Sequence, residues 1–341
     1  MRLVVLVPDL VQDGPVKLVS DFLGRHPMLT ELAKKSDYVV HPRLRTDVAW
    51  GGTLNNMRHA AVARSLGAEA VLASPTGKDT YGRFSVVDLP YIRWADRRPD
   101  DVVLVPDFVS ELVDEVEGPV IAYMQVPIHL RADFDYRSDR VRIWTDSPFM
   151  LAKCQEVFAG KTIPIVPNIV DDRTFEFIPQ AQREPGLVFA FPRKGADYIE
   201  RTRALYRERG GRFWKFELID GLPLKELARQ MRRPQVFLAS AEVEGCALPP
   251  QESMAAGIVV VGKSARGANF SMEHGKTAMV AETPEEAASA LLELEDAEMR
   301  DRISRAAHDF ISRYFPAGEP TNFWREQLRS FGFADVAPPA P

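Results

Sequence analysis

Short runs of consecutive apolar residues recur along this chain and alternate with stretches whose apolar residues lie three or four apart. A strand that is apolar at every position is typical of a parallel sheet buried on both faces. Helical spacing between such strands predicts the helices that connect them. We therefore expect a doubly wound α/β architecture. Strands are expected over 3–7, 38–41, 70–73, 102–105, 120–123, 141–144, 187–191, 213–218, 236–239, 258–261 and 278–280.

The stretches between these strands predict helices with recognisable starts. Asp146-Ser147-Pro148 is a helix-start signal, and a pair of glycines, Gly51-Gly52, precedes another helix. Apolar spacing of three and four supports the remaining segments. Helices are expected over 53–66, 147–158, 284–294, 297–314 and 321–331.

A chain of 341 residues is too long for one ordinary core and suits two α/β domains. Residues 167–186 are polar and rich in proline, as linkers between domains are. We expect a first domain over 1–170, a second over 171–315, and a final helical segment over 316–341 with a frayed end. The carboxyl ends of the strands are the expected place for a ligand.

Net charge is −5 and the pI is near 5.8, so general attraction to nucleic acid is not expected. The two cysteines, Cys154 and Cys246, leave a single disulfide open but favour a reducing cytoplasm. The sequence contains no run of 18 consecutive apolar residues, so a membrane-spanning helix is not expected. The apolar N-terminal run is short and meets Asp9 at once, which favours a buried strand over a signal peptide.

The most informative stretch runs from 236 to 261 as strand, acidic glycine-containing loop, proline-initiated helix, glycine and strand. Gly245 allows the backbone to approach a phosphate closely. The N–H groups at the helix start, over 247–251, are expected to form an anion site. The carboxylate of Glu252 is able to accept hydrogen bonds from two ribose hydroxyls. This pattern indicates a site for a nucleoside diphosphate, although solvated carboxylates are the more usual fate of such a glutamate pair.

The segment 244–255 resembles the signature of the retaining glycosyltransferases of family 4, a group 1 family with the GT-B fold. Nine of its twelve positions match, and the departures are Cys246, Ala247 and Ser253. The resemblance implies two Rossmann-like domains facing a cleft, with the last helix crossing back to the first domain. It implies that Glu252 holds the ribose and Glu244 lies near the donor sugar, and that the loop lines the phosphates through Gly245, Cys246, Ala247 and Leu248.

The resemblance extends to residues outside the signature. It implies that Arg193 and Lys194, after strand 187–191, hold the donor diphosphate, whose charge grows as it leaves. Gly51 and Gly52 are expected to face the phosphates from the first domain, or else to form a plain turn. His129 is expected near the sugar, although a lone histidine is more often structural. The segment 166–171 resembles the family's stretch before the hinge. The loop 262–269 is expected either to contact the donor or to serve only as a connection after the strand 258–261.

The resemblance implies transfer of a sugar from a UDP-, GDP- or dTDP-sugar to an acceptor hydroxyl, with retention of the anomeric configuration and without a metal or a further cofactor. Asp133-Phe134-Asp135 looks like a metal-binding motif but has no supporting context. The acceptor is expected to be a saccharide or glycolipid, as in bacterial polysaccharide, lipopolysaccharide or glycoconjugate synthesis.

Basic residues of the first half favour either a solvated face or peripheral contact with the inner face of the membrane. These basic residues, together with one tryptophan, are Arg25, His26, Lys34, Lys35, Arg43, Arg45, Arg93, Trp94, Arg97 and Arg98. The oligomeric state stays open. Two other functions also stay open: a nucleotide-sugar epimerase of the same fold, and a non-catalytic nucleotide-sugar-binding subunit.

Overall fold

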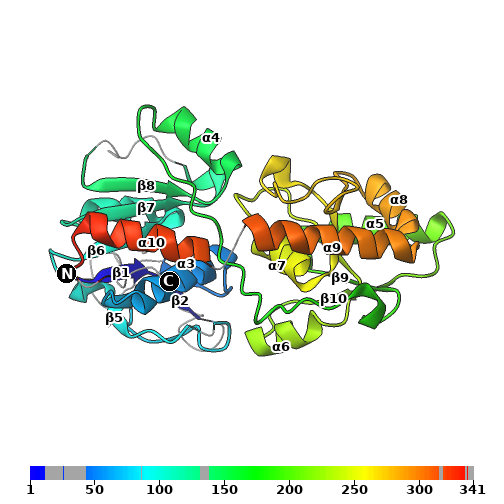
Figure 1. The fold of residues 1–341 in the computed structure, drawn as a ribbon, viewed down its shortest axis with the longest axis horizontal. Helices are drawn as coiled ribbons and strands as arrows, with labels where there is room; N and C mark the ends of the chain where they lie inside the picture. The colour runs from blue at the N-terminus through cyan, green and yellow to red at the C-terminus, as the bar shows by residue number, and fades with distance from the viewer. Residues whose placement is uncertain are drawn as a thin grey trace. The chain divides into compact units, whose positions relative to one another are not determined.

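The computed structural model describes residues 1–11, 26, 44–85, 87–130, 138–314, 318–334 and 336. They form two compact α/β units, shown in Figure 1. Unit 1 comprises Met1–Asp146, Leu151–Val166 and Gly318–Pro341, and unit 2 comprises Ser147–Met150 and Pro167–Ala317. The strand expected over 38–41, the motif at 133–135, the tail over 337–341, and the basic residues Arg25, Lys34, Lys35 and Arg43 lie outside the described residues.

Unit 1 is built on a six-stranded sheet in which every paired strand runs parallel to its neighbour. The order across the sheet reverses between β1 and β6, where chain connections leave in opposite directions. Such a reversal is where ligands bind in doubly wound sheets. In spatial order the strands are β5 (Tyr91–Arg93), β4 (Ala70–Ser74), β1 (Leu3–Leu6), β6 (Val102–Pro106), β7 (Val120–Met124) and β8 (Val141–Thr145). A separate short pair joins β2 (Asp9–Leu10) to β3 (Arg45–Thr46).

The C-terminal helix of the chain completes the core of unit 1. Helix α10 (Gly318–Phe331) packs beside α3 (Gly51–Ser65), as Figure 1 shows. Trp324 of α10 is fully buried and its ring lies 5.2 Å from that of Trp144. Its indole Nε1 donates a hydrogen bond to Nδ1 of His59, 3.0 Å away, so this nitrogen of His59 carries no proton. The unit also contains most of α4 (Pro148–Val157) and short 3-10 helices, including η3 (Asp107–Glu115) and η4 (Pro127–His129).

Unit 2 has a five-stranded parallel sheet whose order reverses between β9 and β11. In spatial order the strands are β10 (Lys215–Leu218), β9 (Leu187–Ala190), β11 (Val236–Ala239), β12 (Val259–Gly262) and β13 (Met279–Val280). Apolar side chains fill both faces of the three central strands, which are fully buried. The helices are α5 (Ala196–Glu208), α6 (Leu224–Gln230), α7 (Leu248–Ala256), α8 (Pro284–Glu293) and α9 (Ala297–Tyr314).

Local sequence explains where the helices of unit 2 begin and end. Helix α7 has proline in its first turn and stops at Gly257, whose φ of 85° is left-handed and suits glycine. Helix α8 begins with a capping box in which Thr283 and Glu286 each bond the other's backbone N–H. Helix α9 buries Ile303, Ala307 and Ile311, which lie four residues apart on one face.

The structure confirms the doubly wound α/β architecture and corrects several local predictions. Gly51 and Gly52 form the first turn of α3 rather than preceding it. The strand expected over 213–218 begins only at Lys215, and it is a partly exposed edge strand. Helices α5 and α6 were not expected, because charged residues interrupt their apolar spacing.

The segment around Arg183 also differs from the exposed linker that its composition predicts. Arg183 and Gln180 are buried, each 3% exposed. Arg183 donates hydrogen bonds to the carbonyls of Ile178, Met231, Pro234 and Ala256. These polar side chains face inward because the surrounding backbone carbonyls need donors.

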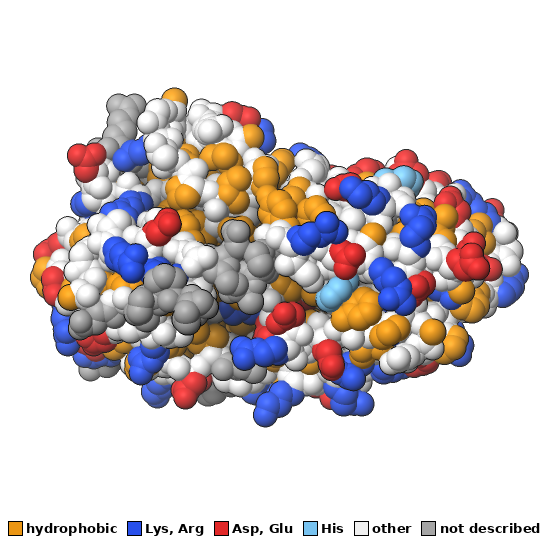
Figure 2. Space-filling model, viewed as in Figure 1, with side chains coloured by type: hydrophobic (Ala, Val, Ile, Leu, Met, Phe, Trp, Pro, Cys, Tyr) orange, Lys and Arg blue, Asp and Glu red, His pale blue; other side chains and the backbone are white. Residues whose placement is uncertain are grey.

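Charge on the visible face of unit 2 is mixed in sign. Figure 2 shows basic and acidic side chains interspersed there rather than gathered into a patch of one sign. Elsewhere in the described part of unit 2, Arg233 forms ion pairs with both Glu184 and Glu217, at 3.0 and 2.9 Å. No helix in the described parts of the chain has the length and apolar content needed to cross a membrane.

Candidate functional site

Two loops meet at the point where the strand order of unit 2 reverses. One follows β9 and contains the 3-10 turn η6 (Pro192–Lys194), and the other follows β11 and leads into α7. Gly195 marks their contact, because a Cβ atom there would lie 2.6 Å from both Cβ and the carbonyl oxygen of Ser240. The φ of Gly195 is 167°, which is extended backbone, so the restriction is steric. A larger residue would push the two loops apart.

An ion pair joins these loops. The ammonium of Lys194 lies 2.5 Å from Oε1 of Glu244, and the two side chains are 38% and 14% exposed. The next strand, β12, is followed by Lys263 and Arg266, which contact Glu242 at 3.6 and 3.5 Å. The carboxyl edge of this sheet therefore gathers cations from two loops around the acidic loop after β11. Such an edge suits a ligand that is itself strongly anionic.

The start of α7 offers fewer backbone donors than the sequence predicts. Pro249 and Pro250 have no N–H group. The N–H of Ala247 donates to Oδ1 of Asn269 at 3.3 Å, within the protein. Any anion site here therefore depends on the remaining amides of the loop rather than on the whole first turn. Glu252 lies further along α7 and is 8% exposed.

Cys246, one of the three departures from the family 4 signature, makes a specific contact within the loop. Its Sγ accepts a hydrogen bond from Nε2 of Gln251 at 2.7 Å. Oε1 of the same Gln251 accepts from Nδ2 of Asn168 at 3.0 Å. Asn168 belongs to the segment 166–171, which resembles the family's stretch before the hinge. Its contact with the signature loop is a feature that sequence reasoning missed.

Unit 1 carries a second polar cluster at the carboxyl edge of its own sheet. Asp107, directly after β6, is 4% exposed, and its Oδ2 accepts the N–H groups of Gln125 and Val126 at 2.8 and 2.7 Å. Its Oδ1 lies 3.3 Å from Nδ1 of His129, whose side chain is 33% exposed. A Cβ at Gly52 would lie 3.1 Å from Oε1 of Gln125. The structure thus brings Gly52, Gln125 and His129 together around Asp107.

The candidate residues are divided between the two units. Gly51, Gly52 and His129 belong to unit 1, whereas Arg193, Lys194, Glu244, Gly245, Cys246, Ala247, Leu248 and Glu252 belong to unit 2. Arg193 is exposed beside Lys194 in η6. Within the described ranges, no group of three or more His, Cys, Asp or Glu side chains is arranged to hold a metal ion.

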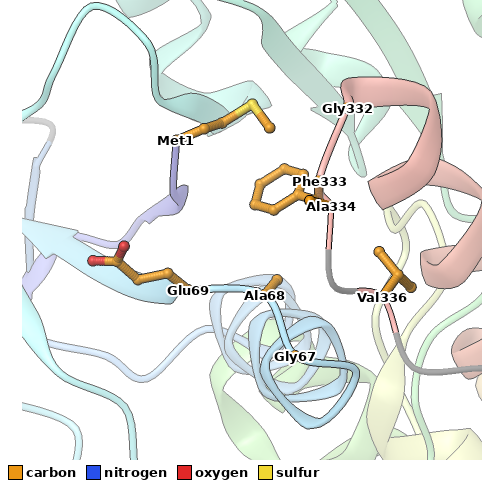
Figure 3. A pocket seen from close by; sticks show the side chains of 8 residues that line it. All are labelled: Met1, Gly67, Ala68, Glu69, Gly332, Phe333, Ala334 and Val336. Atoms are coloured by element: carbon orange, nitrogen blue, oxygen red, sulfur yellow. The ribbon is translucent and has the colours of Figure 1, made fainter.

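A cavity in unit 1 lies at the amino ends of the strands of its sheet. It has a volume of about 300 Å³ and is lined by residues that precede β1 and β4 and residues that follow α10. Figure 3 shows the Phe333 ring within it and the carboxylate of Glu69 directed away from that ring. This cavity is therefore separate from the clusters described above.

The fold places the chain in a known class. Over 97% of its length it resembles a glycosyltransferase from Rickettsia africae (TM-score 0.64, 12% identity, 97% of that chain). It also resembles HepE from Anabaena, solved with UDP-glucose (TM-score 0.57, 12% identity, 97% of this chain and 100% of that chain). These are GT-B structures, and the fold of this chain is GT-B.

More distant or partial similarities agree with this class. Residues 215–310 match the model of the family described as glycosyl transferases group 1, a match that covers less than half of the chain. TarM from S. aureus, solved with UDP, α-GlcNAc-glycerol and fondaparinux, matches 69% of this chain at 12% identity (TM-score 0.54). The chain spans only 56% of that longer protein. No curated protein matches the sequence.

Proposed function

We propose that this chain is a glycosyltransferase that moves a sugar from a nucleoside diphosphate sugar to an acceptor hydroxyl. The observation that carries the proposal is the Lys194–Glu244 pair at the strand-order reversal of unit 2, next to the loop of the family 4 signature. The structures of HepE and TarM contain UDP or UDP-glucose, which supports a uridine donor as the first to test.

In this proposal unit 2 binds the donor. Glu252 accepts hydrogen bonds from the ribose hydroxyls, and Glu244 lies near the donor sugar. Lys194 and Arg193 hold the diphosphate, while the main chain over Gly245 to Leu248 lines it. Charge accumulates on the diphosphate as its bond to the sugar breaks, so fixed cations stabilise the transition state more than the ground state.

The proposed reaction retains the anomeric configuration by front-face substitution. The bond from the anomeric carbon to the phosphate oxygen breaks, and the acceptor oxygen bonds that carbon on the same face. The acceptor proton passes to the departing phosphate oxygen, so the step needs neither a protein nucleophile nor a metal. The protein contributes position and electrostatic stabilisation.

The proposed acceptor is a saccharide or glycolipid that binds mainly to the domain over 1–170, where Gly51 and Gly52 are proposed to face the donor phosphates and His129 to lie near the sugar. The donor domain covers 171–315, and 316–341 returns to the first domain. We propose a cytoplasmic enzyme of bacterial polysaccharide, lipopolysaccharide or glycoconjugate synthesis. Whether it contacts the membrane surface is tested by co-sedimentation with anionic vesicles at low salt, where retention in the supernatant would argue against that contact.

A thermal-shift screen across UDP-, GDP- and dTDP-sugars tests the donor assignment. A donor present at one hundred times its Kd should stabilise the native protein by about 2.7 kcal/mol. If none of these nucleotide sugars raised the melting temperature of the protein, the result would contradict the proposal. Incubating the stabilising donor with a pool of saccharide acceptors then separates the alternatives. Transfer supports the glycosyltransferase, an epimerised donor indicates an epimerase, and binding without either reaction indicates a non-catalytic subunit.

A further inference from the structure

The backbone of three consecutive residues in the signature loop, Gly245 to Ala247, is hydrogen-bonded by buried side chains. Each of these side chains comes from a different part of unit 2. Oγ of Ser147 donates to the carbonyl oxygen of Gly245 at 2.7 Å. Nδ2 of Asn168 donates to the carbonyl oxygen of Cys246 at 2.8 Å. Oδ1 of Asn269 accepts from the N–H of Ala247 at 3.3 Å. We call Ser147, Asn168 and Asn269 the loop clamp.

The clamp residues are themselves held in place. Ser147 is fully buried, and its hydroxyl also accepts the N–H of Met150 at 3.1 Å, as a cap of α4 does. Asn168 is 2% exposed and bonds Gln251. Asn269 is 4% exposed, and its Nδ2 donates to the carbonyl of Lys263 at 3.2 Å. A second bond on each side chain fixes its orientation, so the clamp is rigid before any ligand arrives.

The clamp determines the direction of the loop amides. A trans peptide directs its C=O and N–H groups to opposite sides. The peptide between Cys246 and Ala247 is therefore held at both ends, by Asn168 on one side and Asn269 on the other. The preceding peptide is held by Ser147 through the carbonyl of Gly245, which fixes the direction of the Cys246 N–H. Without these bonds Gly245 would let the loop take many conformations.

We propose that Ser147, Asn168 and Asn269 are positioning residues that preorganise residues 245–247 to receive the diphosphate of the donor. This inference rests on the proposed function of the same site. The clamp residues act through the loop and not on the substrate. Backbone N–H groups that are already oriented need no reordering when charge develops on a phosphate. Their preorganisation is therefore what lowers the energy of the transition state.

The test compares UDP binding by calorimetry in the full chain and its variants. Ser147→Ala and Asn269→Leu each remove one clamp bond, and each should weaken UDP binding about tenfold. Ser147→Thr keeps the hydroxyl and should restore UDP affinity to within about threefold of the parent. This rescue distinguishes a positioning role from general loss of structure.

A matched control separates clamp effects from lost stability. Tyr206 accepts the N–H groups of Phe213 and Trp214 at 2.9 and 3.1 Å, just before β10 and so at the opposite edge of the sheet. Tyr206→Phe should lower the melting temperature without changing the Kd for UDP. Equal UDP affinity in the parent, Ser147→Ala and Asn269→Leu would overturn the clamp alone. If the parent binds none of UDP, GDP and dTDP, the donor-site proposal falls and the clamp falls with it.

Discussion

At the scale of single residues, the Lys194–Glu244 pair is the most direct test of the donor site. The pair is partly exposed, so it contributes little to stability and can be broken at small cost. A diphosphate carries more negative charge than one carboxylate and should replace Glu244 as the partner of Lys194. Under the proposed function, the ion pair keeps the ammonium in place until the donor binds.

We expect Lys194→Ala to lower kcat about a hundredfold or more at saturating donor, because leaving-group charge then lacks its nearest cation. Steady-state kinetics with the donor found in the thermal-shift screen measures this. Lys276→Ala is the control, since Lys276 is an exposed lysine of the same unit that pairs with Glu273 at 2.6 Å. Full turnover of Lys194→Ala at saturating donor would show that the assigned role is wrong.

Cys154 should be inert to thiol reagents in the native protein. Burial, with a smaller contribution from Asp146, raises the pKa of its thiol to about 12. At pH 8 only about one thiol in ten thousand is then a thiolate, which is the reactive form. Peptide mass spectrometry after iodoacetamide treatment should find Cys154 unmodified until urea is added. Alkylation of Cys154 in the native and unfolded protein at similar rates would contradict the prediction.

At the scale of elements, Arg183 holds together the segments around α7. Its guanidinium donates to four carbonyls, which lie before β9, in the connection between α6 and β11, and at the end of α7. Burial lowers the pKa of Arg183 to about 9, so the group remains a cation at neutral pH. A planar group with five N–H donors is suited to several carbonyls at once, whereas an ammonium is not.

Arg183→Leu should reduce the free energy of unfolding by about 3 kcal/mol, because it leaves buried carbonyls without donors. Urea unfolding followed by circular dichroism measures the change. Arg305→Leu is the matched control, since Arg305 is exposed and forms a surface pair with Asp301 at 2.7 Å. The control should change stability by less than about 1 kcal/mol. Similar losses in both variants would argue against a structural role specific to Arg183.

At the scale of the whole molecule, the last described helix completes the core formed by the first part of the chain. Trp324 lies among residues of β1, α3, β7 and β8 in one hydrophobic cluster. Unit 1 is therefore completed by a segment far along the chain from its sheet, whose strands come from the first 145 residues.

Trp324→Ala should lower the free energy of unfolding by about 3–5 kcal/mol, since it removes a fully buried ring. Trp324→Phe keeps most of the packing and loses the bond to His59, so it should cost about 1–2 kcal/mol. Denaturant titrations of the two variants and the parent provide the comparison. Equal stability of Trp324→Ala and the parent would show that α10 does not support the core.

Sequence by itself determined the α/β class. Strands such as 102–105 and 236–239 are apolar at every position and alternate with segments of helical spacing, which favours a parallel sheet covered by helices. It also pointed to the loop after β11, since glycine, proline and glutamate stand there at fixed spacing. It did not find helices α5 and α6, whose burial depends on which side of a charged helix meets the sheet.

Only the tertiary structure decided how that loop is held. Ser147, Asn168 and Asn269 lie far from one another in the chain, and each is an ordinary polar residue in its own segment. Their hydrogen bonds to three successive residues arise because folding brings separate segments to one edge of the sheet. The same holds for Arg183, whose polar neighbours predicted a linker. Local sequence determines the preference of a segment for helix, strand or loop. The hydrogen-bond partner of a buried polar group is determined only when distant segments pack together.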